Sequence, residues 1–133
     1  MLALRYGWPV KRLRFQSPGW AFDFLAYADD AWSEIAVAGE AKRLQKDAVA
    51  LADSLKVCGM RGPHPEESCT QHRNHHRKYV GLLEHRPRIL WIVGPDAFAA
   101  DPELVYRVDE DSGANIRLRH MDARQLTFSG DLN

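Results

Sequence analysis

The stretch Glu34-Ile-Ala-Val-Ala-Gly-Glu-Ala-Lys42 decides the fold, because it is an apolar strand that ends in two charges. Side chains of a β-strand alternate between two faces, so Glu40 and Lys42 point to one face and Ala41 points to the other. A buried strand of this kind should end in small or apolar residues. The two charges therefore indicate a candidate functional site at the end of this strand.

A second apolar stretch, Trp20 to Ala28, lies just upstream and carries one carboxylate, Asp23, in its middle. A buried carboxylate is costly unless it is paired, hydrogen-bonded or bound to a metal, and two neighbouring carboxylates repel. A divalent cation between Asp23 and Glu40 removes the repulsion, and hard oxygen ligands suit Mg²⁺ or Mn²⁺. Lys42 is then placed to stabilise developing charge or to orient an attacking water. The alternative is a structural ion pair between Lys42 and Glu40.

Length and composition indicate one globular domain of 133 residues, with 45% apolar and 27% charged residues. The formal net charge is zero, so the chain lacks the overall basic character of a tight nonspecific nucleic-acid binder. Local basic clusters could still contact phosphate. No stretch approaches the roughly 18 to 20 apolar residues of a membrane span, and no signal peptide is recognisable. We therefore expect a cytoplasmic protein without membrane contact.

The rest of the chain predicts a mixed α/β domain. Val10 to Gln16 alternates as a half-exposed strand before a turn at Ser17-Pro18-Gly19, so the first three strands form an antiparallel meander. Helical periodicity and turn signals then predict the following elements in order: a helix over Leu44–Val57, a loop over Cys58–Glu66, a helix over Glu67–Glu84, a buried strand over Arg88–Val93, and a hairpin of Leu104–Asp109 and Ile116–Met121 around Asp111-Ser112-Gly113.

This order of elements, with an Asp on the second strand and Glu-x-Lys on the third, resembles the core of the PD-(D/E)xK nuclease superfamily, the restriction-endonuclease-like fold. The resemblance covers about Val10 to Val93. It implies that Asp23 and Glu40 bind one or two divalent metals and that Lys42 assists the water that attacks a phosphodiester of DNA or RNA. Some members add a Gln or a basic residue early in the next helix, a role for Gln45 or Lys46.

Three departures from the family pattern shape what we expect of partners. Phe22 stands where the family often has a proline. About nine residues precede the first expected strand, where the family has a helix that often carries a Glu of the site. The resemblance then implies that this helix is missing, or that a longer protein, a second copy or a partner chain supplies it. A non-catalytic nucleic-acid or protein interaction module with the same sheet remains the alternative function.

The third departure is an insertion at about 58–76 that is rich in cysteine and histidine: Cys58, His64, Cys69, His72, His75 and His76. On a helix, Cys69, His72 and His76 share one face, and Cys58 or His64 could complete a tetrahedral structural Zn²⁺ site from the preceding loop. Two other interpretations stay open. The segment is a solvated polar helix face, or His72, Asn74, His75 and Arg77 contact substrate phosphate.

Overall fold

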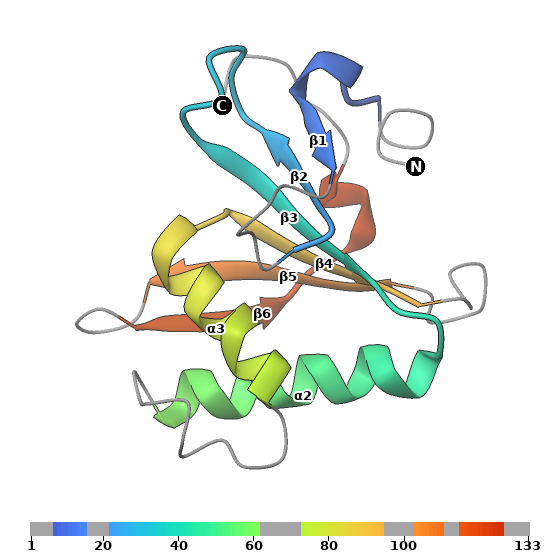
Figure 1. Cartoon of the computed structure of the whole chain (residues 1–133), viewed down its shortest axis with the longest axis vertical. Helices are drawn as coiled ribbons and strands as arrows, with labels where there is room; N and C mark the ends of the chain where they lie inside the picture. The colour runs from blue at the N-terminus through green and yellow to red at the C-terminus, as the bar shows by residue number, and fades with distance from the viewer. Residues whose placement is uncertain (1–6, 16–21, 62–72, 95–102, 111–114, 127–133) are drawn as a thin grey trace.

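The computed structural model describes residues 7–15, 22–61, 73–94, 103–110 and 115–126. Within these ranges the chain forms a six-stranded mixed sheet with two α-helices and two short 3₁₀ helices (Figure 1). The elements in order are η1 (Val10–Arg12), β1 (Leu13–Phe15), β2 (Phe24–Tyr27), β3 (Ile35–Ala41), α2 (Gln45–Arg61), α3 (Arg73–His85), β4 (Ile89–Val93), β5 (Glu103–Glu110), β6 (Ile116–His120) and η3 (Ala123–Leu126). The predicted α/β class is confirmed.

The strands lie in the sheet in the same order as in the chain. Strands β1, β2 and β3 form the expected antiparallel meander, and β4, β5 and β6 form a second antiparallel set. The two sets join where β3 and β4 pair in parallel. A parallel pair needs a crossover connection, and α2 and α3 provide it. The carboxyl ends of β3 and β4 therefore meet at one edge of the sheet.

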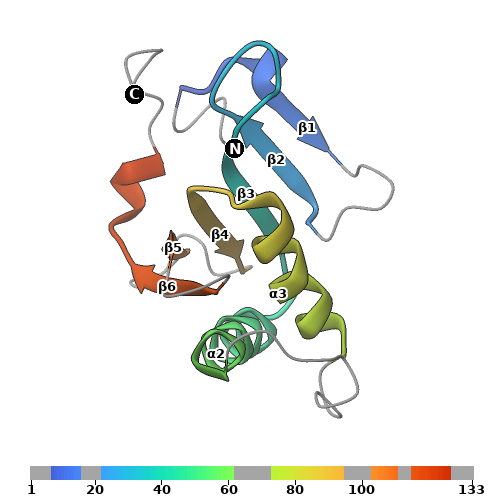
Figure 2. The same ribbon diagram turned by 90° about the vertical axis from the view of Figure 1, so that its left-hand side faces the viewer.

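Both helices pack on the same face of the sheet, which Figure 2 shows with α2 seen nearly end-on. The core on this face joins apolar side chains of α2, such as Leu51 and Leu55, to Tyr79 and Leu82 of α3 and to the sheet. The opposite face is packed around Trp91. The buried residues of that second cluster are Trp8, Ala26, Ala36, Val37, Trp91, Val93, Val105 and Leu126.

The register of β3 turns Glu40 toward the helices. Ala38 belongs to the helix-side cluster and Val37 to the opposite one. Because faces alternate along a strand, Glu40 lies on the helix side with Ala38. It pairs with Ile92 of β4, a fully buried residue. The sequence prediction that β3 carries a charge into the interior is thus realised at this position, where Glu40 is 6% exposed.

Two strand predictions were too long. Val10 to Arg12 forms the 3₁₀ turn η1 instead of a strand, because the Arg12 N–H donates to the Pro9 carbonyl at 3.0 Å and closes a helical turn. Strand β2 begins at Phe24, so Asp23 precedes the strand instead of lying in its middle. The position of Asp23 is still tied to β3 by its backbone hydrogen bond to Gly39.

Helix α2 also differs from the prediction at both ends. Leu44 precedes the helix and is 49% exposed, so it is not part of the apolar helix face. The helix runs on through Cys58 to Arg61, where a loop was predicted. Its apolar period continues from Leu51 and Leu55 to Cys58, which is buried against the sheet, and this burial favours continued helix over a loop.

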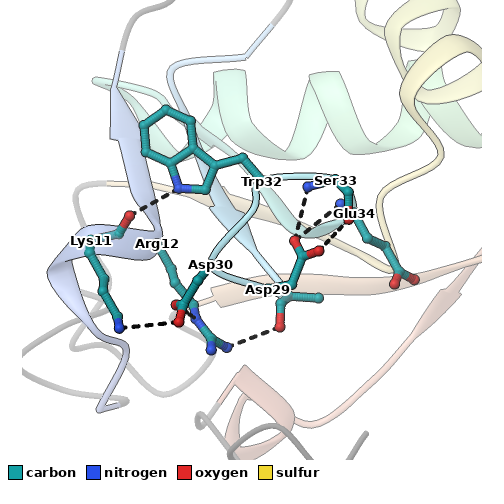
Figure 3. A network of polar contacts seen from close by, with 8 residues as sticks. Lys11, Arg12, Asp29, Asp30, Trp32, Ser33 and Glu34 are labelled. Atoms are coloured by element: carbon teal, nitrogen blue, oxygen red, sulfur yellow. Dashed lines mark hydrogen bonds and ion pairs between the residues drawn. The ribbon is translucent and has the colours of Figure 1, made fainter.

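The β2–β3 turn is held against η1 by a buried arginine (Figure 3). Arg12 is 3% exposed, and its guanidinium donates to Asp30 Oδ1 at 2.9 Å and to the Ala28 carbonyl at 2.9 Å. Within the turn, Asp29 Oδ1 accepts the Ser33 backbone N–H at 2.9 Å. These bonds lower the pKa values of both aspartates, chiefly through Arg12 at Asp30 and through the Ser33 hydroxyl at Asp29. The ionised carboxylates of Asp29 and Asp30 therefore hold the turn in its conformation.

Several predictions fall outside the described residues: the turn at 17–19, the helix segment at 67–72 and the hairpin turn at 111–113. The remaining strand predictions agree with β3, β4, β5 and β6 to within one or two residues at each end. In the portion of the chain that the structure describes, none of the helices has the length and apolar character needed to cross a bilayer.

Candidate functional site

The carboxyl end of β3 brings one carboxylate and two ammonium groups together. Glu40 Oε1 lies 3.1 Å from Lys78 Nζ and 3.7 Å from Lys42 Nζ. Lys42 follows directly after β3, whereas Lys78 comes from α3. The other oxygen, Glu40 Oε2, is buried, and no hydrogen-bond partner for it lies among the described residues. One oxygen of this carboxylate is therefore paired, and the other is buried without a hydrogen-bond partner in the part of the chain that the structure describes.

Asp23 lies beside this end of β3 because two hydrogen bonds hold it there. Its backbone N–H donates to the Gly39 carbonyl at 3.0 Å, and its Oδ2 accepts the Ala41 N–H at 2.8 Å. Ala41 is the immediate neighbour of Glu40, so the structure brings the two predicted carboxylates to the same strand end. Asp23 and Glu40 are distant in the sequence, and the pairing of their neighbours Phe24 and Gly39 between β2 and β3 brings them together.

Burial dominates the electrostatics of Glu40. It raises the pKa of the carboxyl above its ordinary value of 4.5, and the nearby Asp23 carboxylate raises it further. Lys78 opposes the shift most strongly, by charge and by hydrogen bonding, and Lys42 opposes it less. The effect of Asp23 means that the two carboxylates are close enough to repel. The two lysines do not fully offset the cost of burying the Glu40 charge.

Gln45 reaches the same edge of the sheet from the first turn of α2. Its Oε1 is buried, and the described residues offer it no hydrogen-bond partner. The side chain lies against Gly94, directly after β4, where an added Cβ would overlap Oε1. The carbonyl of Val93, one residue earlier, accepts the Lys42 N–H at 2.8 Å. Gln45 thus lies near the end of β3, whereas Lys46, the other predicted candidate, is exposed.

Lys78 is the one site residue that the sequence reasoning missed. It is 14% exposed, its Nζ lies 5.9 Å from the centre of the Phe22 ring, and it is closer to Glu40 than Lys42 is. In the sequence it is one of several basic residues on an amphipathic helix. The neighbouring Tyr79 indicated that this part of the helix faces the core. Only the packing of α3, however, places the Lys78 ammonium at Glu40.

The chemistry open to this site follows from its donors. Asp23 and Glu40 offer two carboxylates, and no cluster of three or more His, Cys, Asp or Glu is found in the described ranges. Mg²⁺ is commonly bound by one or two carboxylates together with waters and substrate phosphates, so this donor set suits it. Glu40 Oε2, which is buried and has no hydrogen-bond partner within the described ranges, would offer an oxygen to such an ion. The residues present therefore fit a hard divalent cation.

The predicted zinc site is not tested, because Cys69 and His72 lie outside the described residues. Of the remaining candidates, His64 also lies outside the described residues, whereas Cys58 on α2 is 6% exposed and His76 on α3 is 4% exposed. His75, considered as a phosphate contact, has its Nδ1 2.9 Å from Ser54 Oγ, a contact between α3 and α2. That contact gives His75 a structural role. The zinc site itself remains a prediction.

A cavity of about 640 Å³ lies at the opposite end of β3 from Glu40. Its lining includes Trp32, Ile35 and Arg86, from the β2–β3 turn, the start of β3 and the residue after α3. Strands rise about 3.3 Å per residue, so Ile35 and Glu40 are separated by roughly 17 Å. We base the site assignment on the carboxylates and not on this cavity, because it contains neither Asp23 nor Glu40.

Comparisons of the chain with protein families, with curated proteins and with solved structures found no match.

Proposed function

We propose that this protein hydrolyses phosphodiester bonds of nucleic acid with Mg²⁺ or Mn²⁺ held by Asp23 and Glu40. The observation that carries the proposal is the half-paired Glu40 carboxylate, which is 6% exposed and has an unpartnered Oε2 among the described residues. A buried carboxylate oxygen without a hydrogen-bond partner is costly. A cation between Glu40 and Asp23 would remove that cost together with their mutual repulsion.

The order of elements supports a restriction-endonuclease-like fold as part of the proposal. An antiparallel meander is followed by α2 and then, after the insertion that departs from the family pattern and α3, by β4; apart from that insertion and α3, this is the order on which the resemblance rests. The candidate residues lie at the carboxyl ends of β3 and β4, where ligands of open α/β sheets commonly bind. The hairpin of β5 and β6 extends this core on its far side.

The chemistry assigns each side chain one task. A bound ion would supply Lewis-acid stabilisation of the charge that grows on the phosphate oxygens. Lys42 is 25% exposed, so its ammonium can meet a substrate phosphate and orient the attacking water. Gln45 packs against Gly94 with its Oε1 buried, so it would support the ends of β3 and β4 from α2 and would not contact that water. The water oxygen bonds to phosphorus as the bond from phosphorus to one ester oxygen breaks; one proton of the water passes through solvent to the leaving oxygen, and the other stays on the new phosphate.

Cleavage assays test the proposal. The purified chain is incubated with single- and double-stranded DNA and RNA in Mg²⁺ or Mn²⁺, next to Glu40→Gln and Lys42→Ala. We expect each substitution to reduce cleavage by about a hundredfold or more. Glu34→Gln is the matched control, because Glu34 precedes β3 at its other end and pairs with Arg88 at 2.6 Å. Cleavage that is absent in wild type, or that survives Glu40→Gln, rejects the enzymatic function.

The second candidate is a non-catalytic nucleic-acid or protein interaction module. Two lysines already lie within 4.0 Å of Glu40, and the carboxylate is almost fully covered, which favours a structural network. Such a network predicts that Mn²⁺ does not raise the melting temperature, because no metal binds at Glu40. Thermal melts of the wild type with and without Mn²⁺, each in the presence of a short phosphodiester oligonucleotide, therefore separate the two candidates without an activity assay.

A further inference from the structure

Lys78 contacts the candidate metal ligand more closely than the lysine of the Glu-x-Lys pattern does. Its Nζ lies 3.1 Å from Glu40 Oε1, against 3.7 Å for Lys42, and its side chain is 14% exposed against 25%. It reaches the site from α3, above the ring of Phe22 at 5.9 Å. The ammonium is therefore held in a partly buried position by packing as well as by charge.

The charges of these groups balance while no metal is bound. Asp23 and Glu40 carry two negative charges, and Lys42 and Lys78 carry two positive charges. A divalent cation that enters alone brings this group of four to a net charge of +2 and lies close to both ammonium groups. An anionic phosphate of the substrate reduces that excess. The charge count thus favours simultaneous occupation by metal and phosphate over occupation by metal alone.

We propose that Lys78 balances the carboxylates of Asp23 and Glu40 in the metal-free protein and keeps metal affinity low until an anionic phosphate joins the site. This inference rests on the proposed function. Lys78 acts through Glu40 and is a positioning residue: it binds Oε1 and leaves Oε2 as the oxygen that faces the ion. By linkage, the phosphate strengthens metal binding by the same factor by which the metal strengthens phosphate binding.

The test measures Mn²⁺ affinity by calorimetry in the absence of nucleic acid. We expect Lys78→Met to bind Mn²⁺ more tightly than wild type by about tenfold or more, because one positive charge beside the ion is removed. Lys78→Arg keeps the charge and should bind like wild type. A role of Lys78 in folding alone would leave metal affinity unchanged or weaken it, so a gain in affinity separates the two explanations.

Lys56→Met is the matched control for a change of net charge. Lys56 lies on α2 with its Nζ 4.8 Å from the centre of the Tyr106 ring, and at 1.5 Å per residue it is about 16 Å along the helix from Gln45. We expect its Mn²⁺ affinity to match that of wild type. An equal gain in Lys56→Met and Lys78→Met would overturn the inference, because the effect would then reflect net charge and not the contact with Glu40.

A second measurement uses the wild type, so it does not depend on the folding of any variant. Melting temperatures are recorded with Mn²⁺, with a short phosphodiester oligonucleotide, and with both. We expect the joint shift to exceed the sum of the separate shifts, and the excess to disappear with an uncharged methylphosphonate oligonucleotide of the same sequence. Additive shifts would overturn the inference.

The outcomes separate this inference from the proposed function. Mn²⁺ binding that is lost in Glu40→Gln but unchanged in Lys78→Met keeps the metal site and rejects the role of Lys78. Absence of Mn²⁺ binding in every variant, with and without the oligonucleotide, rejects both.

Discussion

Gly39→Ala should destabilise the protein, because Phe24 occupies the space that a side chain at position 39 would need. A Cβ built on Gly39 lies closer than 3.0 Å to three atoms of the Phe24 ring. The ring pairs with Gly39 across β2 and β3 and makes an edge contact with Trp91 at a centroid distance of 5.7 Å. It cannot give way without losing that contact. The alanine therefore has to move a ring or a strand.

The magnitude follows from two opposing effects. Overpacking a folded interior costs about 1 to 3 kcal/mol. Replacing a strand glycine with alanine returns about 0.5 to 1 kcal/mol, because the unfolded chain loses conformational freedom. The difference spans about 0 to 2.5 kcal/mol, and we expect a net loss of about 1 kcal/mol or more for Gly39→Ala, because the built Cβ overlaps three ring atoms. For a chain of this length, that lowers the melting temperature by roughly 3 to 10 °C.

Thermal and urea unfolding of Gly39→Ala, Phe24→Ala, their double variant and Gly94→Ala checks the reasoning. Phe24→Ala removes the obstructing ring, so the double variant should be more stable than the sum of the single effects predicts, by about 1 kcal/mol or more. Gly94→Ala is the contrasting control: its Cβ would meet the flexible end of Gln45, so we expect a loss below about 1 kcal/mol. A neutral Gly39→Ala, or strictly additive effects with Phe24→Ala, would refute the steric argument.

Three further predictions concern charge. Burial raises the pKa of Glu40 above 4.5, so the folded state binds this proton more tightly than the unfolded state does. The stability of the wild type relative to Glu40→Gln should therefore fall as the pH rises above 4.5 and level off above the pKa of the folded state. Urea unfolding across this pH range measures the difference. Asp30 should show the opposite pH dependence, because Arg12 and Lys11 lower its pKa below 3.8. The stability that it contributes above pH 3.8 should be lost at lower pH. A difference in unfolding free energy between wild type and Asp30→Asn that stays constant across that range would contradict this. Arg12→Ala, which removes a buried donor to the Ala28 carbonyl, should cost about 1 to 2 kcal/mol in thermal unfolding, whereas an unchanged melting temperature would show that the turn does not need the arginine. For the zinc prediction, metal analysis of the purified protein should find Zn²⁺ that is lost on Cys69→Ser, and its absence from wild type would remove that site.

The candidate site was predictable from sequence where its residues are joined by short connections. Strand periodicity identified Glu40 and Lys42, and the upstream apolar stretch identified Asp23. A hairpin-like connection brings β2 and β3 together, so neighbours in the chain become neighbours in the sheet. The first residue of β2 was not predicted correctly. The pairing of Phe24 with Gly39 decides where the strand begins, and a single apolar stretch does not contain that information.

The order of strands and helices was thus determined by local sequence patterns: continuous apolar stretches for β3 and β4, helical spacing for α2, and a turn signal for the pair of β5 and β6. The burial of Glu40, its contact with Lys78 and the packing of Gln45 on Gly94 were decided by the tertiary structure. Each of these depends on where a helix lies against the carboxyl ends of β3 and β4. That placement comes from the fit of many core side chains at once, and no short stretch of sequence encodes it.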